Sequence, residues 1–285
     1  MAIPPTVLLG LESLAPLPAT ANKLIAMLDE EEVSLAEVAS VIEFDPVVAA
    51  RVLRLARSAA YAGRIPAHDV RTAVMRLGAA TVLDLVLGDY LKTLRVTAPL
   101  YDLAEDELWA HGAASALAVR ALVREVPRAG IPPIAQTAAL MHDIGKLVMV
   151  RTLAARPAQV NSYCASHGVT WIEAERALFG CDHAEVGGAL ARHWNLPPEL
   201  ASAVERHHDS PIEAPDAVVD AVVVANLVAK SVGVGLGAEG LNFRIDPGVS
   251  SRLGLDFGGF SRVCVQAAAG LRDLRDSYRL TVVRP

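Results

Sequence analysis

The 285-residue sequence has little positive charge and no apolar run long enough to cross a membrane. Its 26 Lys and Arg stand against 32 Asp and Glu, which gives a net charge of −6. Nucleic-acid-binding proteins normally present a basic surface, so this balance disfavours that class. The longest apolar stretch, residues 217–229, contains Asp220 and Asn226 and is too short to span a bilayer. The sequence therefore predicts a protein with neither a nucleic-acid nor a membrane partner.

Cysteine is also scarce. The three cysteines are too far apart for a Cys-X-X-Cys pair and too few for a disulfide framework, which predicts a reducing compartment, the cytoplasm. Residues 1–21 have no positively charged start and are interrupted by four prolines, so they do not have the pattern of a signal peptide.

Aromatic residues make up only 5% of the chain, and apolar residues recur every three or four positions. This spacing predicts an all-α fold. We expect a first unit of five helices over about residues 14–95, a second helical unit over about 105–212, and a C-terminal helical extension over 213–285. Ser34 and Asp45 have the pattern of helix N-caps. Residues 34–58 could form a helix-turn-helix, but their acidic residues would face DNA badly.

Histidine is concentrated in the second unit, which holds seven of the eight. His142 and Asp143 are adjacent, and Gly145 can end or bend the helix expected over 133–152, so both side chains can converge on a divalent metal. Lys146 would then lie near a bound phosphate. Two structural alternatives stay open: Asp143 caps a helix and bonds His142, and Lys146 interacts with the dipole at a helix C-terminus.

Helical spacing directs other histidines inward. His111 follows Leu108 by three positions, and His207 follows Val204 by three, which places both on apolar faces, with His208 on the flank. His183 lies at a helix start. Asp182 and Glu185 form a predicted capping box around it.

Several short sequence motifs, which occur in the same order along the chain as in one known family, resemble the motifs of that family. They are Leu-Met-His-Asp-Ile-Gly-Lys at 140–146, Gly-Cys-Asp-His-Ala-Glu-Val-Gly at 180–187, Trp-Asn-Leu-Pro at 194–197 and the His pair at 207–208. Together with Asp45-Pro46 and Ala-Val-Met-Arg-Leu-Gly at 73–78, they strongly resemble the HD-related output domain, HDOD. The resemblance covers about residues 14–212, with an N-terminal lobe over 14–95 and an HD-like lobe over 105–212.

The resemblance implies a relation to metal-dependent phosphohydrolases of the HD superfamily. Their site uses a first His, a His-Asp pair, a later Asp and further histidines for a second metal. The first His and the pair correspond to His111, His142 and Asp143, and the additional ligands resemble His183, His207 and His208. The later Asp is replaced by Asn226, which follows Val222 by four positions and so faces inward, whereas Asp220 lies on the opposite face. There is no Gly-Tyr-Pro phrase of the cyclic di-GMP phosphodiesterases.

Three functional hypotheses follow. The first is a bacterial regulatory output module that contacts signalling proteins in trans, with a degenerate metal site and no catalysis. The second is a phosphohydrolase of a nucleotide or phosphoester that uses Mn, Fe, Zn, Ni or Mg, in which Asp143 and Lys146 would be the catalytic candidates. The third is a sensor that binds a nucleotide without hydrolysing it.

Overall fold

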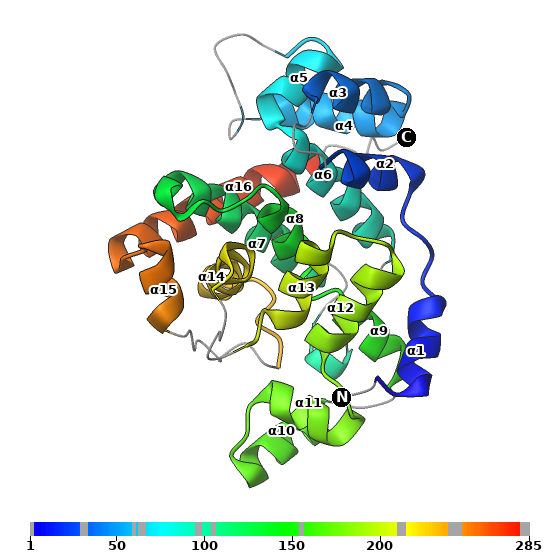
Figure 1. The fold of residues 1–285 in the computed structure, drawn as a ribbon, viewed down its shortest axis with the longest axis vertical. Coiled ribbons are helices and arrows are strands. Elements are labelled where there is room, and N and C mark those ends of the chain that lie inside the picture. The colour runs from blue at the N-terminus through cyan, green and yellow to red at the C-terminus, as the bar shows by residue number, and fades with distance from the viewer. Residues whose placement is uncertain are drawn as a thin grey trace.

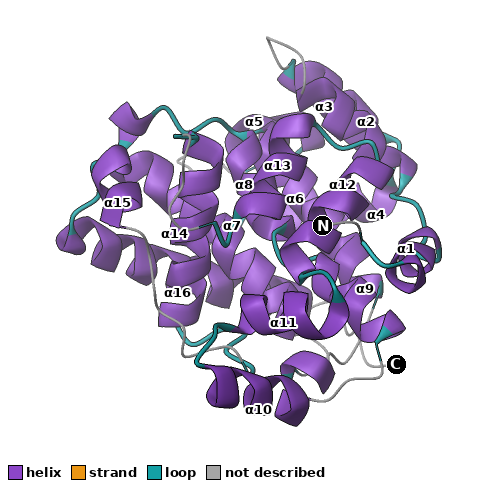
Figure 2. Cartoon of the chain, turned by 60° about the horizontal axis from the view of Figure 1, so that its bottom comes forward, coloured by secondary structure: helices purple, strands orange, loops and turns teal. Residues whose placement is uncertain are grey.

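The computed structural model describes residues 3–28, 34–58, 61, 67–94, 99–103, 107–153, 157–209, 215–238 and 247–279. Helices account for about three quarters of these residues, and none of them lies in a β-strand (Figures 1 and 2). The prediction of an all-α fold is confirmed. Among the helices of these ranges, none combines the length and the apolar character needed to cross a membrane.

The N-terminal lobe is a group of short helices at the top of Figure 1. Asp45 accepts hydrogen bonds from the amides of Val47 and Val48, and Ser34 accepts one from Glu37, so both predicted N-caps are confirmed. Gly78, with φ of 80°, separates the last two helices of the lobe. The helices are α2 (Ala19–Leu28), α3 (Leu35–Glu43), α4 (Pro46–Ala56), α5 (Val70–Leu77) and α6 (Ala79–Thr93).

A further helix, α1 (Pro5–Glu12), precedes this lobe and was not expected among the N-terminal prolines. Proline is well suited to the first position of a helix because its missing amide would have no helical partner there. Pro5 occupies that position, and Val7 and Leu11 are buried one turn apart. α1 lies beside α9 of the second unit, away from the other N-terminal helices (Figure 1).

The second unit contains two departures from the predicted helices. The helix expected over 133–152 is two helices with a turn over residues 142–144, and residues 157–167 form a helix that was not predicted. Only Val160 is buried in that helix, so it lacks a clear apolar stripe. The helices are α7 (Glu107–Glu125), α8 (Ile134–Met141), α9 (Gly145–Thr152), α10 (Pro157–His167), α11 (Trp171–Phe179), α12 (His183–His193) and α13 (Pro198–Arg206), and a short 3-10 helix, η2 (Pro99–Tyr101), precedes α7.

The C-terminal part adds α14 (Ala217–Ser231), α15 (Pro247–Leu253) and α16 (Phe257–Arg279). The sequence around α15 is rich in turn residues and does not by itself predict a helix. α15 begins at a proline, buries Val249 and Leu253, and is tied to α14 by Arg252, whose guanidinium donates to both carboxylate oxygens of Asp220 at 2.7 Å. Tertiary contacts thus select a helix where the local turn residues suggested none.

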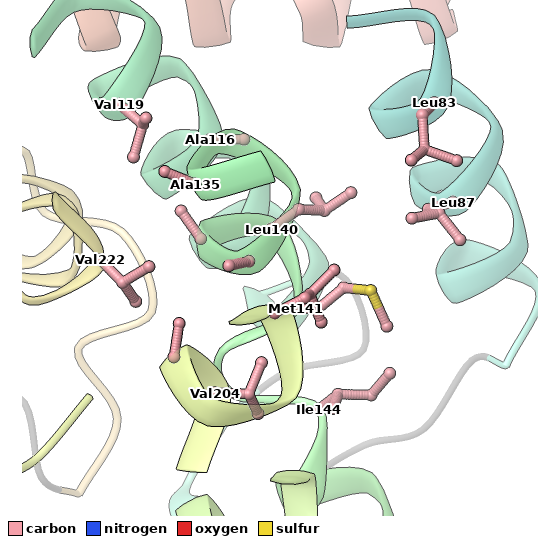
Figure 3. Close-up of a cluster of buried hydrophobic side chains, with 14 of the residues drawn as sticks. Leu83, Leu87, Ala116, Val119, Ala135, Leu140, Met141, Ile144, Val204 and Val222 are labelled. Atoms are coloured by element: carbon pink, nitrogen blue, oxygen red, sulfur yellow. The ribbon is translucent and has the colours of Figure 1, made fainter. Parts of the chain in front are cut away.

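One hydrophobic core runs through both lobes. In Figure 3, Leu83 and Leu87 of α6 point toward Met141 at the end of α8, while Val204 and Val222 approach from α13 and α14. All five side chains are almost completely buried. The helices that carry the candidate site are therefore held by a shared core.

Candidate metal centre

The turn between α8 and α9 carries the central His-Asp pair. His142 is fully buried, and Asp143 is 5% exposed. A Cβ at position 145 would overlap the carbonyl oxygen of His183 and lie 2.6 Å from the amide nitrogen of Gly187. Glycine at position 145 therefore allows α9 to contact the start of α12, and this contact brings His183 to Asp143.

All seven residues singled out as candidate metal ligands lie together. His111 comes from the middle of α7, His183 is the first residue of α12, and His207 and His208 follow α13. α14 supplies Asn226. The other histidines, His68, His167 and His193, are exposed and lie outside the cluster.

Four of the imidazole rings have the same orientation. In each, the Nδ1 atom faces an acceptor that holds the ring, so Nδ1 carries the proton and donates it. A neutral ring bonded in this way has its lone pair on Nε2, and the Nε2 atoms face Asp143. The Nδ1 donors and their acceptors are His111 with Val234 O at 2.9 Å, His142 with Ala139 O at 2.8 Å, His183 with Glu175 Oε2 at 2.9 Å and His207 with Val204 O at 2.6 Å.

The Asp143 carboxylate lies between two pairs of these nitrogens. Its Oδ2 atom is 3.6 Å from His111 Nε2 and 3.5 Å from His142 Nε2. Its Oδ1 atom is 3.3 Å from His183 Nε2 and 3.6 Å from His207 Nε2. Most of these separations are long for hydrogen bonds. They match ligand atoms that share one ion, which are about 3 to 3.5 Å apart when each lies about 2.1 Å from the metal.

Three buried polar atoms of the cluster have no hydrogen-bond partner among the described residues: His142 Nε2, His207 Nε2 and Asp143 Oδ1. Leaving such an atom unsatisfied costs about 1–3 kcal/mol. All three point into the cluster, where a cation would satisfy them together. The residues present therefore fit a metal ion.

The ligand atoms form two groups that share Asp143. One group is His111, His142 and Asp143, and the other is Asp143, His183, His207 and His208; all potential ligand atoms within a group lie within 4.8 Å of one another. His208 Nε2 joins the second group 3.1 Å from His183 Nε2. Two ions joined by one carboxylate would be compatible with this arrangement.

Most side chains of the cluster have the protonation state that binding a metal requires, which is a neutral imidazole or an ionised carboxylate. Burial lowers the pKa of His111, His142 and His208, which keeps these imidazoles neutral at pH 7. Burial alone would raise the pKa of Asp143, but Lys146 and His142 hold it well below its usual range. Asp143 is therefore a carboxylate beside three neutral nitrogen donors.

His183 behaves differently because a second carboxylate lies behind it. Burial lowers the pKa of His183, but the Glu175 carboxylate and the hydrogen bond to Asp143 together raise it to about 10. Glu175 thereby strengthens the basicity of His183, as carboxylates behind metal-bound histidines do.

Lys146 lies inside the pocket and is 4% exposed. Its ammonium donates to Asp143 Oδ2 at 2.9 Å and lies 5.1 Å from the centre of the Tyr101 ring. Lys146 is in the first turn of α9, so the alternative role at a helix C-terminus is wrong. The alternative that Asp143 acts as an N-cap has no support from α9, whose N-terminal flanking residue is Ile144.

Asn226 contacts the first histidine, as its spacing predicted. Its Oδ1 atom lies 3.1 Å from His111 Nε2. Because His111 already donates from Nδ1, a neutral ring needs a donor at Nε2, and turning the Asn226 amide over would supply one. Asp220 faces away and pairs with Arg252. Asn226 thus faces the cluster but brings no charge.

Two residues behind the ligands were missed by sequence reasoning. Glu175 is fully buried and accepts hydrogen bonds from the amide and the ring of His183. Tyr101, on η2, donates its hydroxyl to Glu175 Oε1 at 2.7 Å. Glu175 follows Trp171 by four positions on the buried face of α11, and a charged residue on an apolar face was the available signal.

Comparison with known proteins decides the family. The HDOD domain profile matches residues 14–210. The chain belongs to the HDOD domain family. An HDOD domain protein of unknown function from Geobacter sulfurreducens has a similar structure, with 25% identity, a TM-score of 0.73, and coverage of 98% of this chain and 99% of that chain.

Two further solved structures have a similar fold. A candidate phosphohydrolase from Shewanella amazonensis is 24% identical, with a TM-score of 0.67 and coverage of 95% of this chain and 98% of that chain. A candidate signal transduction protein from Marinobacter aquaeolei is 24% identical, with a TM-score of 0.73 and coverage of 94% and 60%. An uncharacterised protein of Treponema pallidum is 21% identical over 223 residues, which are 77% of this chain and only 43% of that protein.

Proposed function

We propose that this HDOD protein is a signal-transduction module of the bacterial cytoplasm, that its HD pocket holds a divalent metal ion, and that it acts through contacts with other signalling proteins. Metal binding is supported above all by the common orientation of four histidines. Each is anchored at Nδ1 and directed at Asp143 through Nε2. The family and its signalling-related structural neighbour support the regulatory role.

The donor set favours transition metals. Imidazole nitrogen suits Zn, Fe, Ni and Mn better than Mg, which prefers oxygen ligands. Five histidines and one carboxylate make up the two groups found among the described residues. We therefore expect Mn, Fe, Zn or Ni in preference to Mg.

The charge and the burial of the pocket favour a regulatory role over catalysis. HD phosphohydrolases carry an aspartate where this chain has the neutral Asn226, so the pocket holds less negative charge. The inner side chains are also nearly inaccessible, with exposed fractions of 0% for His183 and 7% for Asn226. A phosphoester would have little room to reach the ligands. We therefore propose a degenerate site that binds a metal without turnover.

Elemental analysis of protein purified without chelator tests the metal. We expect about one or more Mn, Fe, Zn or Ni per chain in the wild type, and less than a tenth of that in the His142→Ala/Asp143→Ala variant. His193→Ala removes an exposed histidine from α12 and should keep the wild-type content. Equal metal in all three proteins, or none in a wild type reconstituted with these ions, would contradict the proposal.

A phosphohydrolase is the second candidate, favoured by the carboxylate shared between two ligand groups and by the buried Lys146. A divalent ion held there would polarise a phosphoryl oxygen. Lys146 would orient the phosphate by charge. Hydrolysis of a phosphoester with added Mn²⁺, abolished by Asp143→Ala and kept by His193→Ala, would establish this function and overturn the non-catalytic one.

A further inference from the structure

Tyr101 lies where the connection between the two lobes passes behind the metal pocket. η2 follows α6, the last helix of the N-terminal lobe, and precedes α7, which carries His111. Tyr101 is completely buried there. Its ring lies 5.9 Å from the His183 ring and 6.3 Å from the Trp171 ring, measured between centroids. A residue of the interlobe connection is thus part of the surroundings of the site.

Tyr101 reaches the ligands by two routes. Through its hydroxyl it donates to Glu175, whose other oxygen accepts from the Nδ1 of His183 at 2.9 Å. Through its ring face it contacts the ammonium of Lys146, which is bonded to Asp143. A cation near the face of an aromatic ring is stabilised by the ring quadrupole. Both oxygens of Asp143 therefore have a neighbour that Tyr101 influences.

Among the described residues, Tyr101 and His183 hold Glu175 by hydrogen bonds, and the His183 ring also pairs with its carboxylate. Its two oxygens accept from the Tyr101 hydroxyl, the His183 amide at 3.0 Å and the His183 ring. The neighbouring Arg176 is directed instead at Asp182, at 2.6 Å. If the Tyr101 hydroxyl is removed, Glu175 Oε1 loses a donor in a fully buried place, and the carboxylate becomes free to shift away from His183.

The backbone of Tyr101 is fixed as tightly as its side chain. Its carbonyl oxygen accepts from the Ala238 amide at 2.8 Å, and a Cβ at position 237 would overlap that oxygen. The same loop after α14 supplies the carbonyl of Val234 that anchors His111. Glycine at position 237 thus permits a contact that joins the interlobe connection to a segment touching the opposite side of the pocket.

We propose that Glu175 and Tyr101 are positioning residues of the metal pocket, and that through them metal binding tightens the connection between the two lobes. This inference rests on the proposed metal binding. Through these contacts, the presence or absence of metal in the buried site would affect the N-terminal lobe of the regulatory module. A metal at His183 fixes the ring, the ring fixes Glu175, and Glu175 fixes Tyr101.

Metal titration of the full-length protein tests the positioning role. We expect Glu175→Gln to weaken Mn²⁺ binding by about 10- to 100-fold, as is typical for carboxylates behind metal-bound histidines, and Tyr101→Phe to weaken it by about 3- to 10-fold. The visible absorption of bound Co²⁺ should shift in both variants, because it reports ligand geometry and not stability. Tyr90→Phe is the matched control, since it removes a hydroxyl that donates to Ala15, and neither residue belongs to the ligand groups.

Hydrogen exchange tests the coupling. In the wild type, Mn²⁺ should slow exchange of the peptides that contain Tyr101 and the Ala238 amide, and in Tyr101→Phe this slowing should fall at least threefold at saturating metal. Wild-type affinity, an unchanged Co²⁺ spectrum and wild-type exchange in both variants would overturn this inference while metal binding itself stands. No metal bound by the wild type would instead overturn the proposed function and this inference with it.

Discussion

Asn226 sets the charge of the pocket. It contacts His111 from the position where HD phosphohydrolases carry an aspartate, and it leaves Asp143 as the carboxylate of both ligand groups in the described part of the chain. A neutral amide oxygen can ligate a metal, but it adds no electrostatic attraction. We therefore expect the neutral side chain of Asn226 to limit the affinity of the site for a metal ion.

Asn226→Asp should tighten metal binding by about tenfold or more, because a second carboxylate adds charge to a buried site. Calorimetric titration with Mn²⁺ measures this change directly. Asn161→Asp adds the same charge on the exposed side of α10 and should leave the affinity within about twofold. If Asn226→Asp binds no more tightly than the wild type, Asn226 does not face the metal.

The burial and convergence of the candidate histidine and aspartate ligands could be predicted from the sequence, but the residues that hold them in place could not. His111 and His207 were assigned to inner faces by helical spacing, and both are buried. Glu175 escaped because its partners, Tyr101 and His183, come from other elements, and spacing within one helix says nothing about them. The same holds for the carbonyl of Val234, which anchors His111 from a loop.

Where the local sequence does not determine whether a helix forms or ends, contacts with other helices determine it. Asp182 and Glu185 form the predicted capping box, since both of its hydrogen bonds lie within four residues. α15 was missed because its stabilising partner, Asp220, is on α14. Likewise the break between α8 and α9 depends on the close approach of α12 to Gly145, which a single-helix pattern cannot reveal.

Asp84 links α6 of the N-terminal lobe to α8, which leads into the His-Asp turn. Its oxygens accept from the Gln136 amide at 2.5 Å and the Thr137 hydroxyl at 3.0 Å. Burial raises the pKa of Asp84 to about 7, although these hydrogen bonds oppose the shift. The folded state therefore binds more protons than the unfolded state between about pH 4 and pH 7, so Asp84 destabilises the fold as pH rises through this range.

We expect the free energy of unfolding of the wild type to fall, relative to Asp84→Asn, by about 2 to 4 kcal/mol between pH 4.5 and pH 8. Urea unfolding at several pH values measures the difference. Asp69→Asn is the control: hydrogen bonding to Thr72 lowers the pKa of Asp69, so this group is ionised in both states above about pH 5. It should keep the wild-type slope, and an equal slope in Asp84→Asn would contradict the assignment.

In the described structure, the helices of the two expected lobes contact one another and share one hydrophobic core. α6 packs against α2 and α8, α1 crosses to α9, and a common hydrophobic core continues into α14 (Figures 1 and 3). The prediction of an all-α fold with a His/Asp cluster required only periodicity and motifs. The shared core could not be predicted, because the apolar face of a helix does not show which other helix will pack against it. The boundaries at residues 95, 105 and 212 stay predictions.

In the proposed site, Nε2 atoms from separate helices converge with Asp143 on a metal. A crystal structure of protein grown with Mn²⁺, with anomalous diffraction recorded at the manganese edge, tests it most directly. We expect an anomalous peak about 2.0–2.3 Å from an Asp143 oxygen and from the Nε2 atoms of His142 or His207. A pocket without a peak, or manganese found at the exposed His193 instead, would contradict it.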